Sequence, residues 1–336
     1  FIYLRGEYPR AIRNVQNAIY ESKKHGFLGD NILGSGFNFA LSIVRGAGAY
    51  ICGEETALIE SLEGKRGNPR IKPPFPAVKG VWGCPTVVNN VETIAAVPWI
   101  INNSGADYAK IGIGRSTGTK LISASGHIKN PGVYEIELGL SVYEFMNSDE
   151  YLGGMSSDRP LKAFVPGGSS VPVLPADLIY KTVNGEDRLM TYESLSEGGF
   201  VSGSMLGSGG FIVYNDTSCM VRNTWNFSRF YHHESCGQCS PCREGTGWME
   251  KVLYRIENGH GREEDIDLLL SIQSKIEGNT ICPLGDAAAW PVASAIRHFR
   301  DEFEYHIRFP EKIKNRDHFV TEPFSKVKHL VSKLTV

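Results

Sequence analysis

The stretch Cys236-Gly-Gln-Cys239-Ser-Pro-Cys242 says most about this chain, and a fourth cysteine, Cys282, follows much later in front of Pro283. Three thiolates spaced by three residues can surround one compact inorganic core, and a distant fourth completes its ligand set. Zinc would also accept four sulfurs, but its usual sites combine two separated Cys-x-x-Cys pairs. Buried thiols or a disulfide are the third interpretation. The spacing favours a [4Fe-4S] cluster and predicts a protein that moves electrons.

The composition is that of an ordinary soluble globular protein, with 41% hydrophobic and 21% charged residues. A length of 336 residues allows two or three domains with cores of their own. The net charge of −2, without runs of Lys or Arg, gives no reason to expect nucleic acid as a partner. The longest apolar stretches, such as Thr93 to Ile101, are too short to span a bilayer. We therefore expect no direct membrane insertion.

The chain has seven cysteines, of which Cys52, Cys84 and Cys219 lie outside the cluster pattern. An odd count with metal-type spacing favours a reducing compartment. The chain starts at Phe1 with an apolar run that resembles a strand in the middle of a domain rather than a signal peptide. We therefore expect these residues to be a fragment without its original amino-terminal part.

Residues 1–110 are predicted to form a partial α/β nucleotide-binding domain, because strand and helix signals alternate around glycine-rich turns. The expected strands are Phe1 to Leu4 and Phe37 to Val44. The expected helices are Arg10 to Lys24, Glu54 to Glu63, and Asn89 to Ile101 with a break or an end around Pro98.

Residues 111–216 are predicted to form a small α+β module, and residues 217–336 a helical bundle. The module has a short helix signal at Ser141 to Met146 and strand signals at Lys120 to Gly126, Gly132 to Leu138, Lys162 to Pro166 and Phe211 to Tyr214. The helical part has an apolar stripe at Ile266, Leu269, Leu270, Ile272 and Ile276, and a second helix signal at Ala287 to Phe303. The polar tail after Phe309 is expected to be a loose arm.

Three further motifs are compatible with nucleotide binding, although each has a simpler interpretation. Gly46 to Ala57 combines a glycine turn with a helix start, which can approach a phosphorylated ligand closely or can be only a turn. Lys72-Pro-Pro-Phe75-Pro offers a charge and an aromatic ring, or acts as a proline-rich connector. Asn89 and Asn90 either cap a helix or bind the polar edge of a ligand.

Together these segments resemble the NADH-binding flavoprotein subunit of respiratory complex I. The matching strings are Arg45-Gly-Ala-Gly-Ala-Tyr-Ile-Cys-Gly-Glu-Glu-Thr-Ala-Leu-Ile-Glu60, Lys72-Pro-Pro-Phe-Pro76, Asn89-Asn-Val-Glu-Thr93, Glu234-Ser-Cys-Gly-Gln-Cys-Ser-Pro-Cys-Arg-Glu-Gly245 and Thr280-Ile-Cys-Pro-Leu-Gly-Asp286. The resemblance implies an FMN domain, a ubiquitin-like soluble-ligand-binding module at 111–216 and a helical domain with a [4Fe-4S] cluster. The family's glycine-rich loop would lie upstream of Phe1.

The resemblance also implies roles for individual residues. Positions that line the flavin are Tyr50, Gly53, Glu54, Glu55, Asn89, Asn90 and Thr93. Positions near the nicotinamide dinucleotide are Glu55, Lys72 and Phe75, and the cluster ligands are Cys236, Cys239, Cys242 and Cys282. The implied reaction is hydride transfer from NADH to FMN, followed by one-electron transfer to the cluster. It needs no side chain as a catalytic acid or base.

The implied partners are a neighbouring [2Fe-2S] thioredoxin-like subunit and the iron–sulfur subunit of the complex I peripheral arm. The implied location is the cytoplasmic side of the bacterial inner membrane as a peripheral subunit, or else the mitochondrial matrix side. One alternative is the diaphorase subunit of an NAD-linked hydrogenase or formate dehydrogenase, which often has further ferredoxin-type cysteines at its carboxyl end. No such set follows Cys282. An alternative of another class is a zinc-stabilised, non-catalytic interaction protein.

Overall fold

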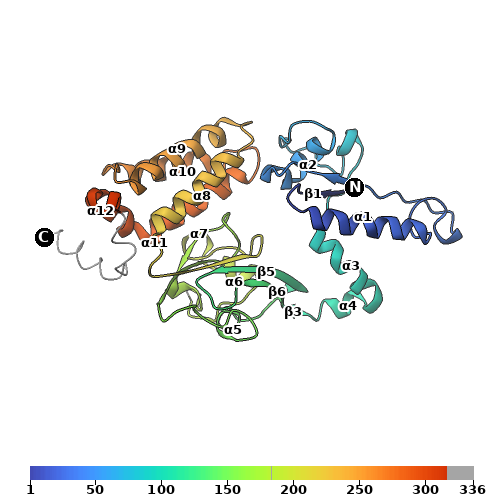
Figure 1. The fold of residues 1–336 in the computed structure, drawn as a ribbon, viewed down its shortest axis with the longest axis horizontal. Coiled ribbons are helices and arrows are strands. Elements are labelled where there is room, and N and C mark those ends of the chain that lie inside the picture. Colours follow the sequence, from blue (N-terminus) through green and yellow to red (C-terminus); the bar gives the residue numbers. More distant parts are fainter. Residues whose placement is uncertain (183, 316–336) are drawn as a thin grey trace. The chain divides into compact units, whose positions relative to one another are not determined.

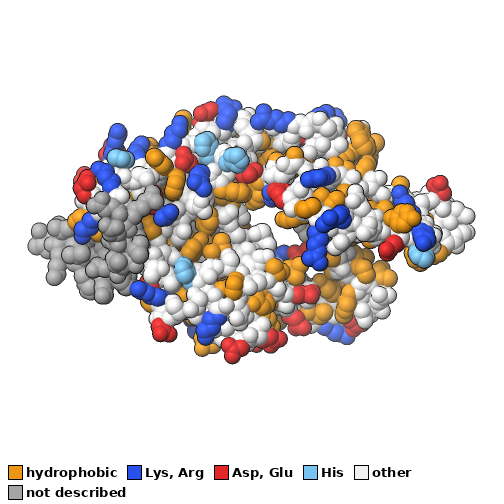
Figure 2. Space-filling model, in the orientation of Figure 1, with side chains coloured by type: hydrophobic (Ala, Val, Ile, Leu, Met, Phe, Trp, Pro, Cys, Tyr) orange, Lys and Arg blue, Asp and Glu red, His pale blue; other side chains and the backbone are white. Residues whose placement is uncertain are grey.

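The computed structural model describes residues 1–182 and 184–315. The chain divides into two units, Phe1–Asn89 and Asn90–Val336 (Figure 1). Lys and Arg side chains are interspersed with Asp and Glu over the face that Figure 2 shows. No helix in the described part of the chain combines the length and the hydropathy that a membrane crossing requires.

The first unit contains a small β-α-β arrangement. Strands β1 (Ile2–Leu4) and β2 (Ile43–Arg45) pair in parallel, and helix α1 (Pro9–Lys24) lies between them in the chain. A proline in the first turn suits the start of α1, where its missing N–H costs no hydrogen bond. The other elements are helix α2 (Glu55–Leu62) and the 3-10 helices η1 (Ile32–Gly34), η2 (Tyr50–Gly53) and η3 (Val81–Gly83).

The predicted strand from Phe37 to Val44 is wrong over most of its length, because only its last two residues belong to β2. Phe37 and Phe39 are exposed, so their alternation does not mark a buried face. Phe39 instead forms an isolated bridge with Gly29, and the Asn38 side chain accepts a hydrogen bond from the Asn31 amide at 2.7 Å. These local bonds replace the ladder that a longer strand would need.

The second unit starts with helix α3 (Val91–Asn103) and the short helix α4 (Gly105–Tyr108). The expected break of α3 around Pro98 is wrong, since the helix continues past it. Proline removes one N–H donor, and α3 has no buried residue, so the carbonyl group without a partner can face solvent. A small hairpin of β3 (Gly112–Ile113) and β4 (Ser116–Thr117) follows.

A five-stranded sheet forms the centre of the second unit, with the order β6-β5-β9-β7-β8. Its strands are β5 (Thr119–Gly126), β6 (Gly132–Glu137), β7 (Leu161–Val165), β8 (Leu174–Pro175) and β9 (Gly210–Asn215). Strands β5 and β9 are parallel, and the other neighbours are antiparallel. The short helices are α5 (Val142–Asn147), η4 (Ala176–Leu178), α6 (Tyr192–Ser196) and α7 (Gly199–Ser202).

The core of this sheet is aromatic. Phe211 on β9 lies edge-on to Phe145 of α5, with 5.4 Å between ring centroids, and 5.7 Å from Phe164 of β7. All three side chains are fully buried. The sequence signals for these strands and for α5 are confirmed to within a residue or two.

The rest of the second unit is helical: α8 (Met220–Glu234), α9 (Ser240–Glu257), α10 (Asp265–Ile276), α11 (Leu284–Arg308) and α12 (Pro310–Asn315). Helices α8, α9 and α11 pack on one another, and α10 packs on α9 and α11 (Figure 1). Residues 310–315 are helical, so the expected arm does not begin at Phe309, and its remainder lies outside the described residues. The sheet is joined to α11, where the Ser294 hydroxyl accepts a hydrogen bond from the Val173 amide at 3.0 Å.

Candidate functional site

The turn before α2 exposes backbone to open space. Ile51 and Cys52 of η2 are buried and anchor the turn, whereas Gly53 is exposed and Tyr50 is half-buried. A Cβ atom at Gly53 would have no neighbouring atom within 4 Å. A planar ligand can therefore approach this backbone without displacing protein atoms.

Glu54 fixes the start of α2. Its Oε2 accepts hydrogen bonds from the backbone amides of Thr56 and Ala57, both at 2.9 Å, and from the Thr56 hydroxyl at 2.5 Å. These bonds satisfy amides that have no partner inside the helix, as an N-cap side chain does. Because Oε2 makes these bonds, the Glu54 side chain is held in one orientation.

Lys72 brings together three of the residues selected from the sequence. Its ammonium group forms an ion pair with the Glu55 carboxylate and lies 3.2 Å from Oε1 of Glu54. Burial alone would lower the pKa of Lys72, but hydrogen bonds and charge attraction from Glu55 and Glu54 outweigh it and raise the pKa. The lysine therefore carries its positive charge at all physiological pH values. Phe75, in the same loop, is 57% exposed.

Arg70 ties the Lys72 loop to α2, a role that the sequence reasoning missed. Its amide donates to the Thr56 hydroxyl at 2.8 Å, and its guanidinium donates to Glu60 at 2.5 Å and to Glu63 at 3.1 Å. A third bond runs to the Gly80 carbonyl at 3.0 Å. The signal was available, because an arginine stands two positions before Lys72 and two glutamates stand on one face of α2.

The three remaining flavin candidates lie at the junction of the units. Asn89 ends the first unit, to which Glu54 also belongs, whereas Asn90 and Thr93 begin the second and therefore do not share a unit with Glu54. The Asn90 side chain caps α3 by accepting a hydrogen bond from the Glu92 amide at 2.8 Å. The helix-cap interpretation of Asn90 is therefore confirmed, while ligand binding by these residues stays a prediction.

The cysteine triplet forms the connection between α8 and α9. Cys236 and Cys239 are half-buried, and Cys242, in the first turn of α9, is buried. Arg243 holds this connection by donating to the Gly237 carbonyl at 3.0 Å, which no sequence signal indicated. The three thiols thus share one short segment at the same end of the bundle.

The environment of Cys242 is suited to a bound cation. Burial raises the pKa of its thiol, a contact with the Ser235 hydroxyl opposes this, and the neighbouring thiols of Cys239 and Cys236 raise it further. The Ser235 oxygen and the Cys242 sulfur are 3.1 Å apart. A thiolate here requires compensating positive charge, which a metal centre supplies, and hydrogen bonds to sulfur tune a cluster's potential.

Cys282 lies in the loop between α10 and α11. The end of α10 is close to the first turns of α9, because a Cβ at Gly245 would lie 2.6 Å from Ile276. Only glycine permits this approach, and it brings the start of the Cys282 loop towards the triplet. In the described chain no three of these four sulfurs lie within 4.8 Å of one another.

Comparison with known proteins gives a consistent result for both parts of the chain. Residues 1–99 match the Nuo51 FMN-binding domain, and residues 222–306 match the NADH-ubiquinone oxidoreductase-F iron-sulfur binding region. The second F subunit of NADH-quinone oxidoreductase of Rhizobium meliloti is 50% identical over 308 residues, which are 91% of this chain and 70% of that protein. The F subunit of NADH-quinone oxidoreductase of Rickettsia felis is 48% identical over 309 residues, 92% of this chain and 70% of the relative.

A solved structure has the same fold over most of the chain. The NAD+-reducing [NiFe]-hydrogenase in its H2-reduced state matches with a TM-score of 0.78 and 33% identity, covering 91% of this chain and 48% of the hydrogenase chain. This chain therefore spans about half of that hydrogenase polypeptide. From the two matched regions and the identity to its curated relatives, the chain belongs to the family of NADH-quinone oxidoreductase F subunits, which are flavin- and iron–sulfur-binding oxidoreductases.

Proposed function

We propose that the four cysteines Cys236, Cys239, Cys242 and Cys282 hold the [4Fe-4S] cluster of this electron-input subunit. The observation that carries the assignment is that three thiols share one short segment, with Cys236 and Cys239 between α8 and α9 and Cys242 buried in the first turn of α9. The donor set consists of soft thiols. It fits an iron–sulfur cluster better than a hard cation.

The turn Tyr50–Gly53 and the Glu54–Glu55–Lys72 group are the proposed flavin and dinucleotide site. Open space above Gly53 leaves room for a flat ring. The ammonium group of Lys72 has three N–H donors, two of which are directed to Glu54 and Glu55. The third can reach the diphosphate of NADH. Phe75 would add an exposed ring for stacking, and Asn89, Asn90 and Thr93 complete the proposed flavin contacts.

As a member of its family, the chain is the NADH-oxidising subunit that passes electrons from FMN to the cluster. FMN, when bound by these residues, would supply the chemistry that takes a hydride from NADH and passes electrons on singly. The protein's own part is to position NADH. Glu54 and Glu55 hold the Lys72 ammonium in place, and its remaining N–H would donate a hydrogen bond to a phosphate oxygen.

The proposed domain layout keeps three parts: 1–110 for FMN and NADH, 111–216 as a ubiquitin-like module, and 217–336 as the iron–sulfur domain. Support for the module comes from the order of its strands in the sheet, which is β6-β5-β9-β7-β8. The strands that come first and last along the chain, β5 and β9, are neighbours in this sheet and run parallel. In chain order this places the strands as 2-1-5-3-4, with α5 after the first hairpin, which is the arrangement of a β-grasp sheet.

The relatives are named as subunits of NADH-quinone oxidoreductase, so we propose that this chain works inside a multi-subunit complex. The proposed neighbours are the [2Fe-2S] thioredoxin-like subunit and the iron–sulfur subunit of the peripheral arm. The proposed location is peripheral, on the cytoplasmic side of the bacterial inner membrane, and the alternative is the mitochondrial matrix side.

A diaphorase subunit of an NAD-linked hydrogenase is the second candidate, because the hydrogenase structure matches most of this chain. The higher identity to the quinone-linked relatives favours the first candidate. Metal analysis of the complex purified through this chain separates the two. Nickel in stoichiometric amount would identify a hydrogenase, and quinone reduction without nickel identifies the proposed function.

The cluster assignment is tested by Cys239→Ala in the purified complex. We expect loss of the cluster signal, because the variant lacks one of the four proposed ligands. Electron flow to quinone should be lost with it, because the cluster is the group of this chain that would accept single electrons from the flavin. Oxidation of NADH by artificial acceptors that take electrons from flavin should persist. Cys84→Ala is the matched control, since Cys84 is an exposed thiol outside the triplet. Retention of the full cluster signal in Cys239→Ala would refute the ligand set.

A further inference from the structure

We propose that Cys219, Glu257 and His306 form a second metal site, which binds one Zn²⁺ ion at the end of the helical bundle remote from the cysteine triplet. These residues belong to none of the sequence strings that carry the resemblance, although Glu257 and His306 lie within the matched region 222–306. Zinc binding by them does not depend on the proposed electron transfer.

The three ligand groups are already gathered. The Cys219 sulfur lies 3.3 Å from Nε2 of His306 and 3.9 Å from Oε2 of Glu257. Nδ1, the other nitrogen of the His306 ring, lies 3.7 Å from the same carboxylate oxygen, and a zinc ion would take only one of the two nitrogens. In the described part of the chain they are the one group of three such side chains whose ligand atoms all lie within 4.8 Å of one another. Ligands of a tetrahedral zinc ion are about 3.3–3.8 Å apart, given its usual bond lengths.

The donor types also suit zinc. A thiolate, an imidazole and a carboxylate are the side chains that bind this ion in proteins. All three are buried, with exposed fractions of 8% for Cys219, 5% for Glu257 and 0% for His306. Metal ions favour such water-poor surroundings when the ligands neutralise their charge.

The surrounding charges favour a divalent cation. Glu302 of α11 is buried beside Cys219, accepts a hydrogen bond from the Met220 amide at 2.8 Å, and pairs with Lys162 of β7 at 2.6 Å. Two buried carboxylates and a thiol thus face one lysine and one histidine. A bound Zn²⁺ would take the thiolate and Glu257 as ligands and balance their negative charge.

The position of the sulfur is fixed independently of any ion. Cys219 is the N-cap of α8, and its sulfur accepts a hydrogen bond from the Arg222 amide at 3.4 Å. Donors of this kind orient a ligand before the metal binds, which lowers the cost of assembling the site.

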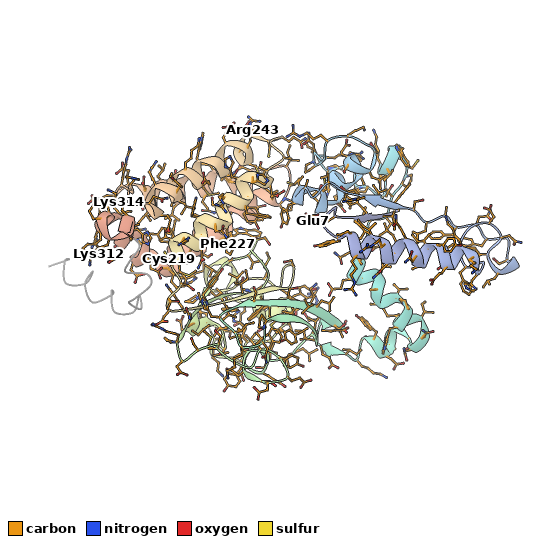
Figure 3. The ribbon with its side chains drawn as sticks, viewed as in Figure 1. Glu7, Cys219, Phe227, Arg243, Lys312 and Lys314 are labelled. Atoms are coloured by element: carbon orange, nitrogen blue, oxygen red, sulfur yellow. The ribbon has the colours of Figure 1, made fainter. Side chains whose placement is uncertain are left out.

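The placement in the bundle gives the site a structural purpose. Cys219 begins α8, Glu257 ends α9, and His306 lies in the last turn of α11. The opposite ends of the same helices carry the triplet and Cys282. Figure 3 labels Cys219 at one end of the bundle and Arg243, beside the triplet, at the other. Zinc would clamp α8, α9 and α11 at the end that the cluster does not hold.

The test is zinc and iron analysis of the purified, cluster-containing protein after growth with added zinc. We expect about one zinc ion per chain in the wild type and at least a fivefold loss in Cys219→Ser and His306→Gln. The matched control Cys84→Ser should keep its zinc. Cys219→Asp, which restores an anionic ligand, should retain most of the metal and serves where Cys219→Ser folds poorly.

Zinc K-edge absorption of the wild type identifies the ligands. We expect one sulfur with nitrogen and oxygen neighbours. A shell of four sulfurs would place the zinc at the triplet and overturn the proposal. A wild-type protein with full iron content and no zinc would also overturn the proposal. Cys219, Glu257 and His306 would then form only a hydrogen-bonded network. Unchanged zinc in Cys219→Ser at full iron content would overturn it equally.

Discussion

Lys72 is the single residue on which most of the proposed dinucleotide site depends. Its charge is held by Glu55 and Glu54, and Glu54 is itself fixed by the amides at the start of α2. The proposed binding of NADH and the formation of α2 are therefore linked through the carboxylate of Glu54. The sequence indicated that Lys72 and Glu55 could lie near the same ligand, but not that they form an ion pair.

Lys72→Ala should raise the Kd for NADH by about tenfold or more, because a hydrogen bond to a charged group contributes about 1.5–3 kcal/mol. The cluster spectrum should not change. Titration of the purified protein with NADH measures the effect, with Lys79→Ala as the control on an exposed lysine of the same loop. Equal affinities of the two variants would remove Lys72 from the site.

Glu63 makes the stability of the folded protein depend on pH, and the partners of its carboxylate determine the direction of that dependence. Hydrogen bonds from Lys65 and from the Trp82 amide lower the pKa of Glu63 to about 2. A lowered pKa means that the folded state favours the carboxylate, so its stabilisation is complete above the ordinary value of 4.5. That stabilisation is lost as the pH falls from there through about 2.

Glu63→Gln should therefore lower the thermal midpoint at pH 6. The difference from wild type should narrow at pH 3, because the Glu63 carboxyl group of the unfolded chain is then already protonated, whereas that of the folded protein is only beginning to protonate. Differential scanning of both proteins at each pH measures this difference. Glu186→Gln, at an exposed glutamate, is the control and should show no comparable trend. A difference in thermal midpoint between wild type and Glu63→Gln that increases towards pH 3 would contradict the assigned hydrogen-bond partners of Glu63.

At the scale of elements, the join between α9 and α10 depends on one ion pair. Asp265 is fully buried at the start of α10 and accepts two hydrogen bonds from the Arg255 guanidinium, one of them at 2.7 Å. It also accepts one from the Arg262 amide at 2.9 Å. Removing the charge on Asp265 leaves a half-buried arginine without its bidentate partner.

Asp265→Asn should therefore destabilise the protein by about 3 kcal/mol, the usual cost of breaking a buried pair. Asp267→Asn is the matched control in the same helix. Asp267 also forms an ion pair, with Arg300 at 3.3 Å, but its side chain is 78% exposed. An exposed pair contributes less than about 1 kcal/mol. Urea unfolding measured by the helical signal should separate the two variants, and equal midpoints would refute the assigned role.

Elements with strong periodicity could be predicted from the sequence. Helices α1, α2 and α10 and the strands β5, β6, β7 and β9 start and end close to their expected residues, whereas β8 had not been expected. The strand at Phe37 failed, because side-chain hydrogen bonds and turns compete with a sheet in ways that alternation does not reveal. Buried groups formed from distant segments, such as Cys219 with His306, have no sequence signal at all.

At the scale of the molecule, each unit presents its chemistry on connections rather than inside regular elements. In the first unit the candidate binding residues lie in the turn before α2 and in the Lys72 loop. In the second unit Cys236, Cys239 and Cys282 lie in the loops that precede α9 and α11, and Cys242 lies in the first turn of α9.

The proposed function requires that NADH reduce an iron–sulfur cluster held by four cysteines of this chain. Electron paramagnetic resonance of the purified protein before and after NADH, combined with iron, sulfide and flavin analysis, examines this requirement without intermediate steps. We expect about four iron and four sulfide ions per chain at the triplet and Cys282, bound flavin, and a cluster signal that NADH elicits and Cys239→Ala abolishes. A protein with zinc at these four thiols and no signal after NADH would contradict the proposed function.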